Sequence, residues 1–427
     1  MLYTQKLLAE LERTRDHFTS YQARYGLQLG AYRAALSSLG TRYGTAAALL
    51  DKQAKRLASA PGSQSAGARP TGEYDRWRGS GGEGVPVLPF GHAFPHHEAA
   101  RSWAECLRGT TTFAVDGSQL LPWRDASVPI ALVQAGLFEN PHEPLDSAAT
   151  YKDYKKDVVT ELLPPDELLT AVPDTDARTG EALGYSTQIV HLRRFELEVN
   201  TLIARMEHHA GRPAEEPSAG PVIAFYDGSL IVSFALKMPT PYRDRYVQAM
   251  RKLLRASYTY KIPLIGYIDT SYARDVVTML GMLQEDPPAE TAGVHDALLW
   301  FGSMSWGDRS PAFVSARDDI ERMGYEEQQH DVAFVYFQAA VDCPPARVEF
   351  PRWVLEAGRL DAVLDAVRGE VIAGNGYPYA IEAADAVAVI SNSDRAQFYS
   401  IFQAFAEREG LAFGFSRKAL SKSRRRV

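Results

Sequence analysis

The run TTFAVDGSQ at residues 111–119 is the stretch that decides the fold. It begins with the apolar and β-branched residues of a buried strand, and it ends in an acid followed by a glycine turn. The same pattern returns as PVIAFYDGSL at residues 221–230. Asp116 and Asp227 are therefore each predicted at the carboxyl end of a buried strand, where α/β sheets place their ligand sites.

The Asp-Gly-Ser sequence that ends both strands has two interpretations. It is ordinary turn chemistry, which would explain a single copy. Two copies on comparable strands favour a functional site, since Gly117 and Gly228 would let a metal ion or a phosphate approach the backbone closely.

The sequence around these two strands alternates between strand and helix patterns. Amphipathic helices are predicted at 186–206 and 243–258, and strands at 128–138 and 262–269. Later segments follow the same alternation, with strands near 332–341 and 346–350 and helices near 358–373, 379–391 and 394–408. The alternation predicts an α/β domain with a mixed central sheet flanked by helices.

Four regions follow from composition along the chain. Residues 1–57 are rich in Leu, Ala, Arg and Glu and predict a helical arm. Residues 58–98 form a Gly/Ser/Pro-rich linker, residues 99–412 the main domain, and residues 413–427 a basic C-terminal tail.

Overall composition is that of an ordinary globular protein, with 45% apolar and 23% charged residues among 427. No window approaches the ~18 apolar residues of a membrane helix, and the first residues lack the apolar core of a signal peptide. Cys106 and Cys343 are the only cysteines and are far apart, which excludes a disulfide framework or a zinc ribbon. We expect a cytoplasmic protein with no membrane partner.

The net charge of −7 argues by itself against a nucleic-acid partner. Its distribution qualifies that argument, because residues 417–427 hold six basic residues and no acid. Such a tail suits a polyanion, and a solvated tail would have the same composition.

The helix at 186–206 carries an acid at an unexpected place. At about 100° per residue, Glu196 falls within an apolar stripe formed by Ile189, Leu192, Val199 and Ile203. Glu198 projects from nearly the opposite side. A carboxylate on a core-facing stripe needs a partner or a cation, and an ion pair with Arg193 is the alternative to a ligand role. His208 and His209, at the end of this helix, are better explained by capping or solvent contact than by metal binding.

A second acid of this kind is Asp385, in GYPYAIEAADAVAVI at 376–390. That helix is apolar nearly all round, so burial is expected and Asp385 would need a partner. Asp116, Glu196, Asp227 and Asp385 together offer the oxygen ligands that Mg²⁺ or Mn²⁺ prefers. Four carboxylates can hold two such ions about 3.5–4 Å apart, an arrangement that hydrolyses phosphodiesters. Their order on an α/β sheet resembles the RNase H-like nuclease superfamily.

Six segments in order narrow the resemblance. They are FAVDGSQ (113–119), RRFE (193–196), FYDGSL (225–230), WGDRSPAF (306–313), RVEFPRWV (347–354) and GYPYAIEAADAVAVI (376–390). This ordered set resembles the NurA family of DNA nucleases. The resemblance implies that Asp116, Glu196 and Asp227 are catalytic metal ligands. It also maps a C-terminal Tyr–His pair onto Tyr377 and Asp385, so this chain has Asp where many members have His; Tyr379 is the alternative tyrosine.

The resemblance further implies an activity and partners. It implies Mn²⁺-stimulated 5′-to-3′ exonuclease activity and endonuclease activity on single-stranded DNA. It implies a homodimer with a central channel for DNA. It also implies partnership with HerA, a hexameric ATP-driven translocase, in the resection of DNA double-strand breaks.

The helix at 243–258 is the predicted DNA contact. Its basic residues are Arg243, Arg245, Arg251, Lys252 and Arg255, interleaved with Tyr242, Tyr246, Tyr258 and Tyr260. Phosphate contacts combined with aromatic stacking would favour single-stranded DNA without sequence preference. A solvated basic helix face is the alternative, just as Arg347 and Glu349 can form a structural ion pair elsewhere.

Two other functions are compatible with the same strands. An actin-like ATPase or sugar kinase would need Gly-rich phosphate loops in the second half, where residues 373–376 are a poor match. A non-catalytic adaptor of a DNA translocase would use its acids structurally. Replacing Asp116 by Asn separates the nuclease from the adaptor, and ATP turnover by the chain alone would identify the kinase-like protein.

Overall fold

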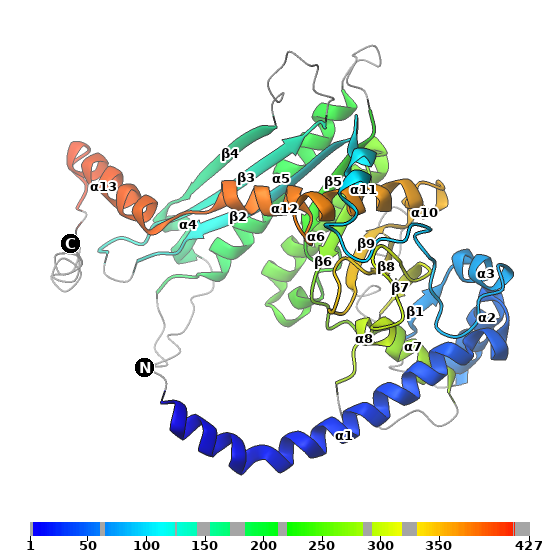
Figure 1. Cartoon of the computed structure of the whole chain (residues 1–427). Helices are drawn as coiled ribbons and strands as arrows, with labels where there is room; N and C mark the ends of the chain where they lie inside the picture. The colour runs from blue at the N-terminus through cyan, green and yellow to red at the C-terminus, as the bar shows by residue number, and fades with distance from the viewer. Residues whose placement is uncertain are drawn as a thin grey trace. The chain divides into compact units, whose positions relative to one another are not determined.

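The structure is a computed structural model that describes residues 3–59, 65–123, 126–142, 154–170, 184–211, 220–284, 293–317, 331–412 and 414. Strands in these residues form a mixed nine-stranded sheet in the order β1-β7-β8-β9-β6-β5-β2-β3-β4 (Figure 1). The predicted α/β class, with a mixed sheet flanked by helices, is confirmed. The chain divides into two compact units. Unit 1 is residues 1–103, 267–360 and 375–377, and unit 2 is residues 104–266, 361–374 and 378–427.

Unit 2 is built on the strand that opened the sequence analysis. β2 (Thr111–Leu120), β3 (Ala131–Asn140) and β4 (Lys155–Leu163) form an antiparallel meander. After α4 (Pro165–Thr170) and α5 (Gln188–Ala210), the chain enters β5 (Val222–Asp227), which pairs parallel with β2. The order β4-β3-β2-β5 with one parallel crossover is the predicted RNase H-like arrangement.

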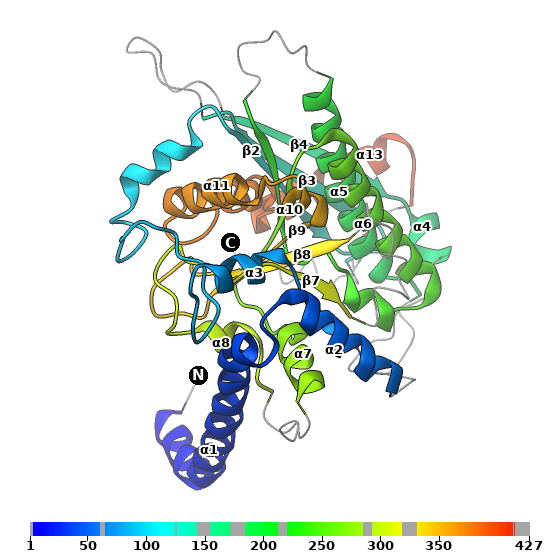
Figure 2. The same ribbon diagram turned by 90° about the vertical axis from the view of Figure 1, so that its right-hand side faces the viewer.

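The remaining helices of unit 2 cover these strands. The 3₁₀ turn η2 (Ser233–Lys237) and α6 (Thr240–Tyr260) follow β5, and β6 (Leu264–Ile268) comes next. The 3₁₀ segment η1 (Arg101–Leu107) precedes β2, and α11 (Leu360–Ala373), α12 (Tyr379–Ala388) and α13 (Asn392–Arg408) close the chain. α12 crosses one face of β2 and β3 and α5 lies behind them, while α5 and α6 run side by side (Figures 1 and 2).

Unit 1 contains the predicted N-terminal helical arm. It begins with α1 (Thr4–Tyr43) and α2 (Ala46–Ser59) and continues through β1 (Gly67–Pro70) and α3 (Gly72–Gly79). Its later elements are α7 (Asp275–Leu283), α8 (Ala297–Trp300), β7 (Phe313–Ala316), β8 (Val332–Phe337), β9 (Ala346–Pro351) and α10 (Arg352–Glu356). Tyr32, Leu36 and Leu39 of α1 belong to the core cluster around Trp300 and Phe313.

The described part of the predicted linker, residues 65–98, is folded. β1 pairs antiparallel with β7, and Tyr74 and Trp77 of α3 are buried. Short apolar and aromatic residues between the glycines supply this packing, which the Gly/Ser/Pro content obscured. The predicted basic tail, 413–427, lies outside the described residues except for Gly414. Within the described residues, no helix has both the length and the apolarity to cross a bilayer.

Candidate active site

Asp116 lies on β2 opposite Gly136 of β3. A Cβ atom at Gly136 would stand 2.5 Å from the backbone nitrogen of Ala388, so only glycine lets α12 pack this closely on the strand. The Gln134 side chain also donates a hydrogen bond to the Ala388 carbonyl at 3.0 Å. This close packing brings Asp385 of α12 into hydrogen-bond contact with Asp116.

The other end of α12 is held by a buried carboxylate. Glu370 of α11 is 1% exposed and accepts hydrogen bonds from the Ala380 backbone N–H at 2.7 Å and from the Thr112 hydroxyl at 2.6 Å. Because Thr112 lies on the same strand as Asp116, Glu370 fixes the start of α12 relative to β2. Sequence reasoning missed this residue, since a buried Glu in an apolar helix can be recognised only once its partners are known.

The Asp116 carboxyl is in an electrostatically unfavourable place for a negative charge. Burial raises its pKa to about 6, the Gly117 backbone N–H opposes the rise, and the neighbouring Asp385 carboxyl adds to it. Arg194 lowers the pKa only slightly in comparison. Two adjacent carboxyls that are short of positive charge favour either a shared proton or a bound cation.

Glu198 of α5 lies on the opposite face of the same strand. A Cβ atom at Gly117 would stand 2.1 Å from Oε1 of Glu198, and successive strand residues point to opposite faces. Asp116 therefore faces α12, while Gly117 faces α5. Burial raises the pKa of Glu198 to about 7; the Arg194 guanidinium opposes the rise, and the charges of Asp116 and Asp227 add to it.

Asp227 ends β5 and is exposed. The parallel register pairs Ala114 with Phe225, so two residues further along each strand Asp116 and Asp227 reach the same edge of the sheet. The chain then turns at Gly228, whose φ of +127° favours glycine. The two Asp-Gly-Ser sequences thus lie next to each other, as predicted from the sequence, and the Asp227 charge acts on Glu198.

Glu196, the acid chosen from the sequence, is not part of this group. Arg245 of α6 donates to both of its carboxylate oxygens at 2.8 and 2.5 Å, and Arg193 lies 3.5 Å away. The ion-pair alternative is therefore the observed one, with Arg245 as the main partner. Glu198 takes the place that the sequence analysis gave to Glu196.

The reason for this difference is that α5 is covered on two sides. Its apolar stripe packs on α6, where the rings of Phe195 and Tyr246 are 4.9 Å apart. Its polar side lies against the sheet, where Arg205 pairs with Glu139 and Arg194 donates to the Gly117 carbonyl. The amphipathic pattern showed the first contact and assigned the second face to solvent.

His209 illustrates the same error. It was expected at the helix end as a cap or in solvent, but it is buried with Nε2 2.9 Å from Oε2 of Glu139, and its ring stacks on Phe113. Burial raises the pKa of Glu139, but His209 and Arg205 outweigh it and bring the pKa to about 2. This is a compensated structural contact between α5 and β3.

Asp385 and the two tyrosine candidates also differ from expectation. Asp385 is exposed, because the buried side of α12 is formed by alanines and Ile381. Tyr377 belongs to unit 1, where its ring packs edge-on against Tyr267 at 5.2 Å. Tyr379 lies on α12 in edge-on contact with Phe138 at 5.5 Å.

The basic residues of α6 separate into two groups. Lys252 and Arg255 are exposed, while Arg243 and Arg251 are half-buried. Arg245 is held by Glu196, which corrects its assignment as a DNA contact. Tyr242 and Tyr246 are buried and cannot stack on bases. Tyr260 donates a hydrogen bond to Glu207 at 3.0 Å.

Comparison with known families decides the kinship. The model of the NurA domain matches residues 110–390, well over half of the chain. The chain belongs to the NurA family. It is similar to the crystal structure of a NurA with manganese, with 10% identity and a TM-score of 0.31, covering 69% of this chain and 89% of that one. It is also similar to a NurA bound to dAMP and manganese, with 10% identity and a TM-score of 0.30, covering 66% and 85%. The search of curated proteins found no match.

The NurA site has the donor chemistry of a hard divalent cation. Its carboxylates are short of positive charge, and Oε1 of Glu198 is buried without a hydrogen bond. Across the described chain, no three His, Cys, Asp or Glu side chains stand grouped as a finished metal site. Division of the acids between two faces of β2 accounts for that. A cleft of about 950 Å³ is lined by residues of unit 1, such as Arg69 and Ser315, and by none of these acids.

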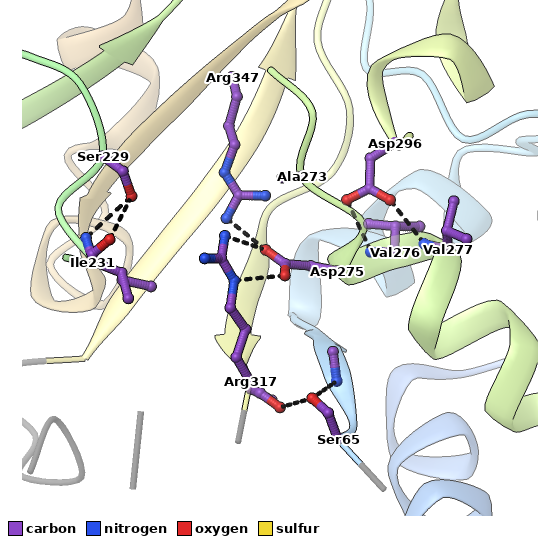
Figure 3. Close-up of polar contacts among 12 residues, drawn as sticks. Ser65, Ser229, Ile231, Ala273, Asp275, Val276, Val277, Asp296, Arg317 and Arg347 are labelled. Atoms are coloured by element: carbon purple, nitrogen blue, oxygen red, sulfur yellow. Dashed lines mark hydrogen bonds and ion pairs between the residues drawn. The ribbon is translucent and has the colours of Figure 1, made fainter. Parts of the chain in front are cut away.

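A second acidic cluster of the NurA domain lies in unit 1. Asp275 is paired with Arg317 and Arg347, both at 2.7 Å, as Figure 3 shows. Arg347 also pairs with Glu349 at 2.7 Å, the ion pair that the sequence left open. Asp296 accepts hydrogen bonds from the backbone N–H groups of Val276 and Val277 at the start of α7, at 2.9 and 2.8 Å (Figure 3).

Proposed function

We propose that this NurA-family chain is a metal-dependent deoxyribonuclease whose site is formed by Asp116, Glu198, Asp227 and Asp385. The observation that carries the proposal is the contact of Asp116 with Asp385, next to a buried Glu198, at the strand end of an RNase H-like core. Neither carboxyl of the Asp116–Asp385 pair is balanced by an arginine ion pair within 4 Å in the described residues. Such a place is unfavourable for the apo protein and suits Mn²⁺ or Mg²⁺.

The residues of the chain would share the work as follows. Asp116, Asp227 and Asp385 would hold the cation from the edge of the sheet, and Glu198 from the α5 face. When bound, one or two such ions supply Lewis acidity to the phosphate and lower the pKa of a water nucleophile. Glu370 and Gln134 keep α12 seated on β2 and β3, so Asp385 stays next to Asp116. Tyr377 is retained as a proposed catalytic residue from the family resemblance.

Lys252 and Arg255 are the proposed phosphate contacts. They are one helical turn apart on the exposed side of α6, the helix that follows the β5 strand of Asp227. Arg243 and Arg251 remain candidates at its margins. Contacts of this kind bind the sugar–phosphate backbone without reading sequence.

Family resemblance supports the wider role. We propose 5′-to-3′ exonuclease and single-strand endonuclease activity, a homodimer, and action with a HerA-type hexameric translocase in double-strand-break resection. Oligonucleotides labelled at either end would report polarity, and light scattering would report the dimer. Degradation from the 3′ end, or a monomer at micromolar concentration, would remove the corresponding part.

The decisive experiment for the activity compares the native chain with Asp116→Asn. The native protein should degrade single-stranded DNA with Mn²⁺ and lose this activity with a chelator. Asp116→Asn should lose about 1,000-fold in rate while remaining folded, because a cation ligand is removed. Unchanged degradation would contradict the proposal and favour the adaptor, and ATP turnover by the chain alone would favour the kinase-like protein.

A further inference from the structure

We propose that Arg194 is a built-in counter-cation that competes with the divalent ion for Glu198 and thereby sets the metal affinity of the site. The inference rests on the proposed function, because it concerns the same carboxylates. It adds a residue that neither the motifs nor the family resemblance singled out.

One nitrogen of Arg194 lies between two oxygens. Its Nη1 donates a hydrogen bond to the Gly117 carbonyl at 2.9 Å and stands 3.0 Å from Oε1 of Glu198. A backbone carbonyl and a carboxylate gathered around one positive group form a place for a cation, and both are ligand types that Mn²⁺ and Mg²⁺ accept. The guanidinium therefore holds a position that a metal ion at Glu198 would contest.

The Arg194–Glu198 contact is held by charge more than by hydrogen bonding. Oε1 of Glu198 has no hydrogen bond of acceptable geometry, and Nε of Arg194 is likewise without one. A compact divalent ion interacts more strongly with the carboxylate than a delocalised guanidinium does. The present pair is thus suited to exchange.

Exposure shows which partner can move. The Glu198 side chain is 7% exposed and is held against Gly117, whereas the Arg194 side chain is 31% exposed. Arg194 can swing toward water without leaving a cavity in the core, and Glu198 cannot. In the apo protein the arginine relieves a charge that is already strained by Asp116 and Asp227.

Arg193 provides a matched control on the same helix. It pairs with Glu161 at 3.0 Å and with Glu196 at 3.5 Å, and it does not contribute to the charges acting on Asp116 or Glu198. Its removal changes the formal charge of the chain by the same amount as removal of Arg194. Only the position of the charge differs.

The test is calorimetric titration of Mn²⁺ into the chelator-stripped full chain, without DNA, at pH 8. Arg194→Gln should lower the Kd for Mn²⁺ about ten-fold, the size expected for removing one nearby positive charge. Arg194→Lys, which keeps the charge, should stay within about three-fold of the native Kd, as should Arg193→Gln. Circular dichroism would establish that each variant is folded.

Each other outcome is informative. Unchanged or weaker Mn²⁺ binding by Arg194→Gln would overturn the competition, and so would equal tightening by Arg194→Lys, which would indicate loosened packing. A native chain that binds no Mn²⁺ would instead contradict the proposed function itself.

Discussion

Two acidic clusters of this chain have opposite electrostatics. In unit 1, Asp275 is flanked by Arg317 and Arg347, and although burial raises its pKa, the two guanidiniums outweigh it and the pKa is lowered. In unit 2, the pKa of Asp116 is raised to about 6 and that of Glu198 to about 7. The comparison teaches that grouped acids alone do not mark a site. What distinguishes the unit 2 cluster is carboxylate charge left without enough positive charge beside it.

Breaking the compensated cluster should have the largest effect on stability. Arg347 is 1% exposed, so Arg347→Met would leave Asp275 and Glu349 buried without their shared partner. We expect the free energy of unfolding to fall by about 3–5 kcal/mol, measured by urea denaturation. Asp116→Asn, the matched change in unit 2, should leave it nearly unchanged. A loss below 1 kcal/mol in Arg347→Met would show that the unit 1 network is not structural.

The pH dependence of stability should sharpen the comparison. A carboxyl whose folded pKa is raised binds more protons in the folded than in the unfolded state, so the metal-free chain should lose stability as the pH rises from about 4.5 to 7. Glu198→Gln should flatten this slope, with urea midpoints at pH 5 and pH 7.5 as the readout. The variant is needed because the buried Asp296, with its pKa raised to about 7, contributes the same sign. An unaltered slope in Glu198→Gln would contradict the assigned environment.

The smallest expected effect concerns the DNA contact on α6. Lys252→Ala combined with Arg255→Ala should weaken binding of single-stranded DNA several-fold and reduce the dependence of log Kd on log salt by about one to two. Lys55→Ala, which removes an exposed lysine paired with Asp51 on α2, is the control. Fluorescence anisotropy at several salt concentrations would measure both. Equal effects of the two changes would leave α6 without a specific role.

Much of the fold followed from local sequence. The two Asp-Gly-Ser strands, the helices between them and the mixed sheet were predictable, because strand and helix periods are local properties. Their adjacency in the sheet was predictable as well, from the rule that parallel strands end at one edge. Residues 65–98 were not, since β1 is short and acquires its meaning only from pairing with β7.

The acid on α5 shows where sequence reasoning ended. Glu196 and Glu198 are both polar residues in an amphipathic helix, and the hydrophobic pattern identifies only the apolar side. Here that side packs on α6, and the polar side is buried on the sheet through ion pairs. Asp385 was misjudged in the opposite direction, as a buried residue that is in fact exposed. Both errors depend on tertiary partners that a single helix does not reveal.

The most direct measurement of the account compares Glu198→Gln with Glu196→Gln in Mn²⁺-dependent DNA degradation. The two residues lie two positions apart on α5, and each change removes one carboxylate charge. We predict that Glu198→Gln loses about 100-fold or more in rate, as expected for a residue that holds the cation, and that Glu196→Gln stays within about five-fold of the native enzyme. The reverse order, with Glu196→Gln inactive and Glu198→Gln active, would contradict the site described above.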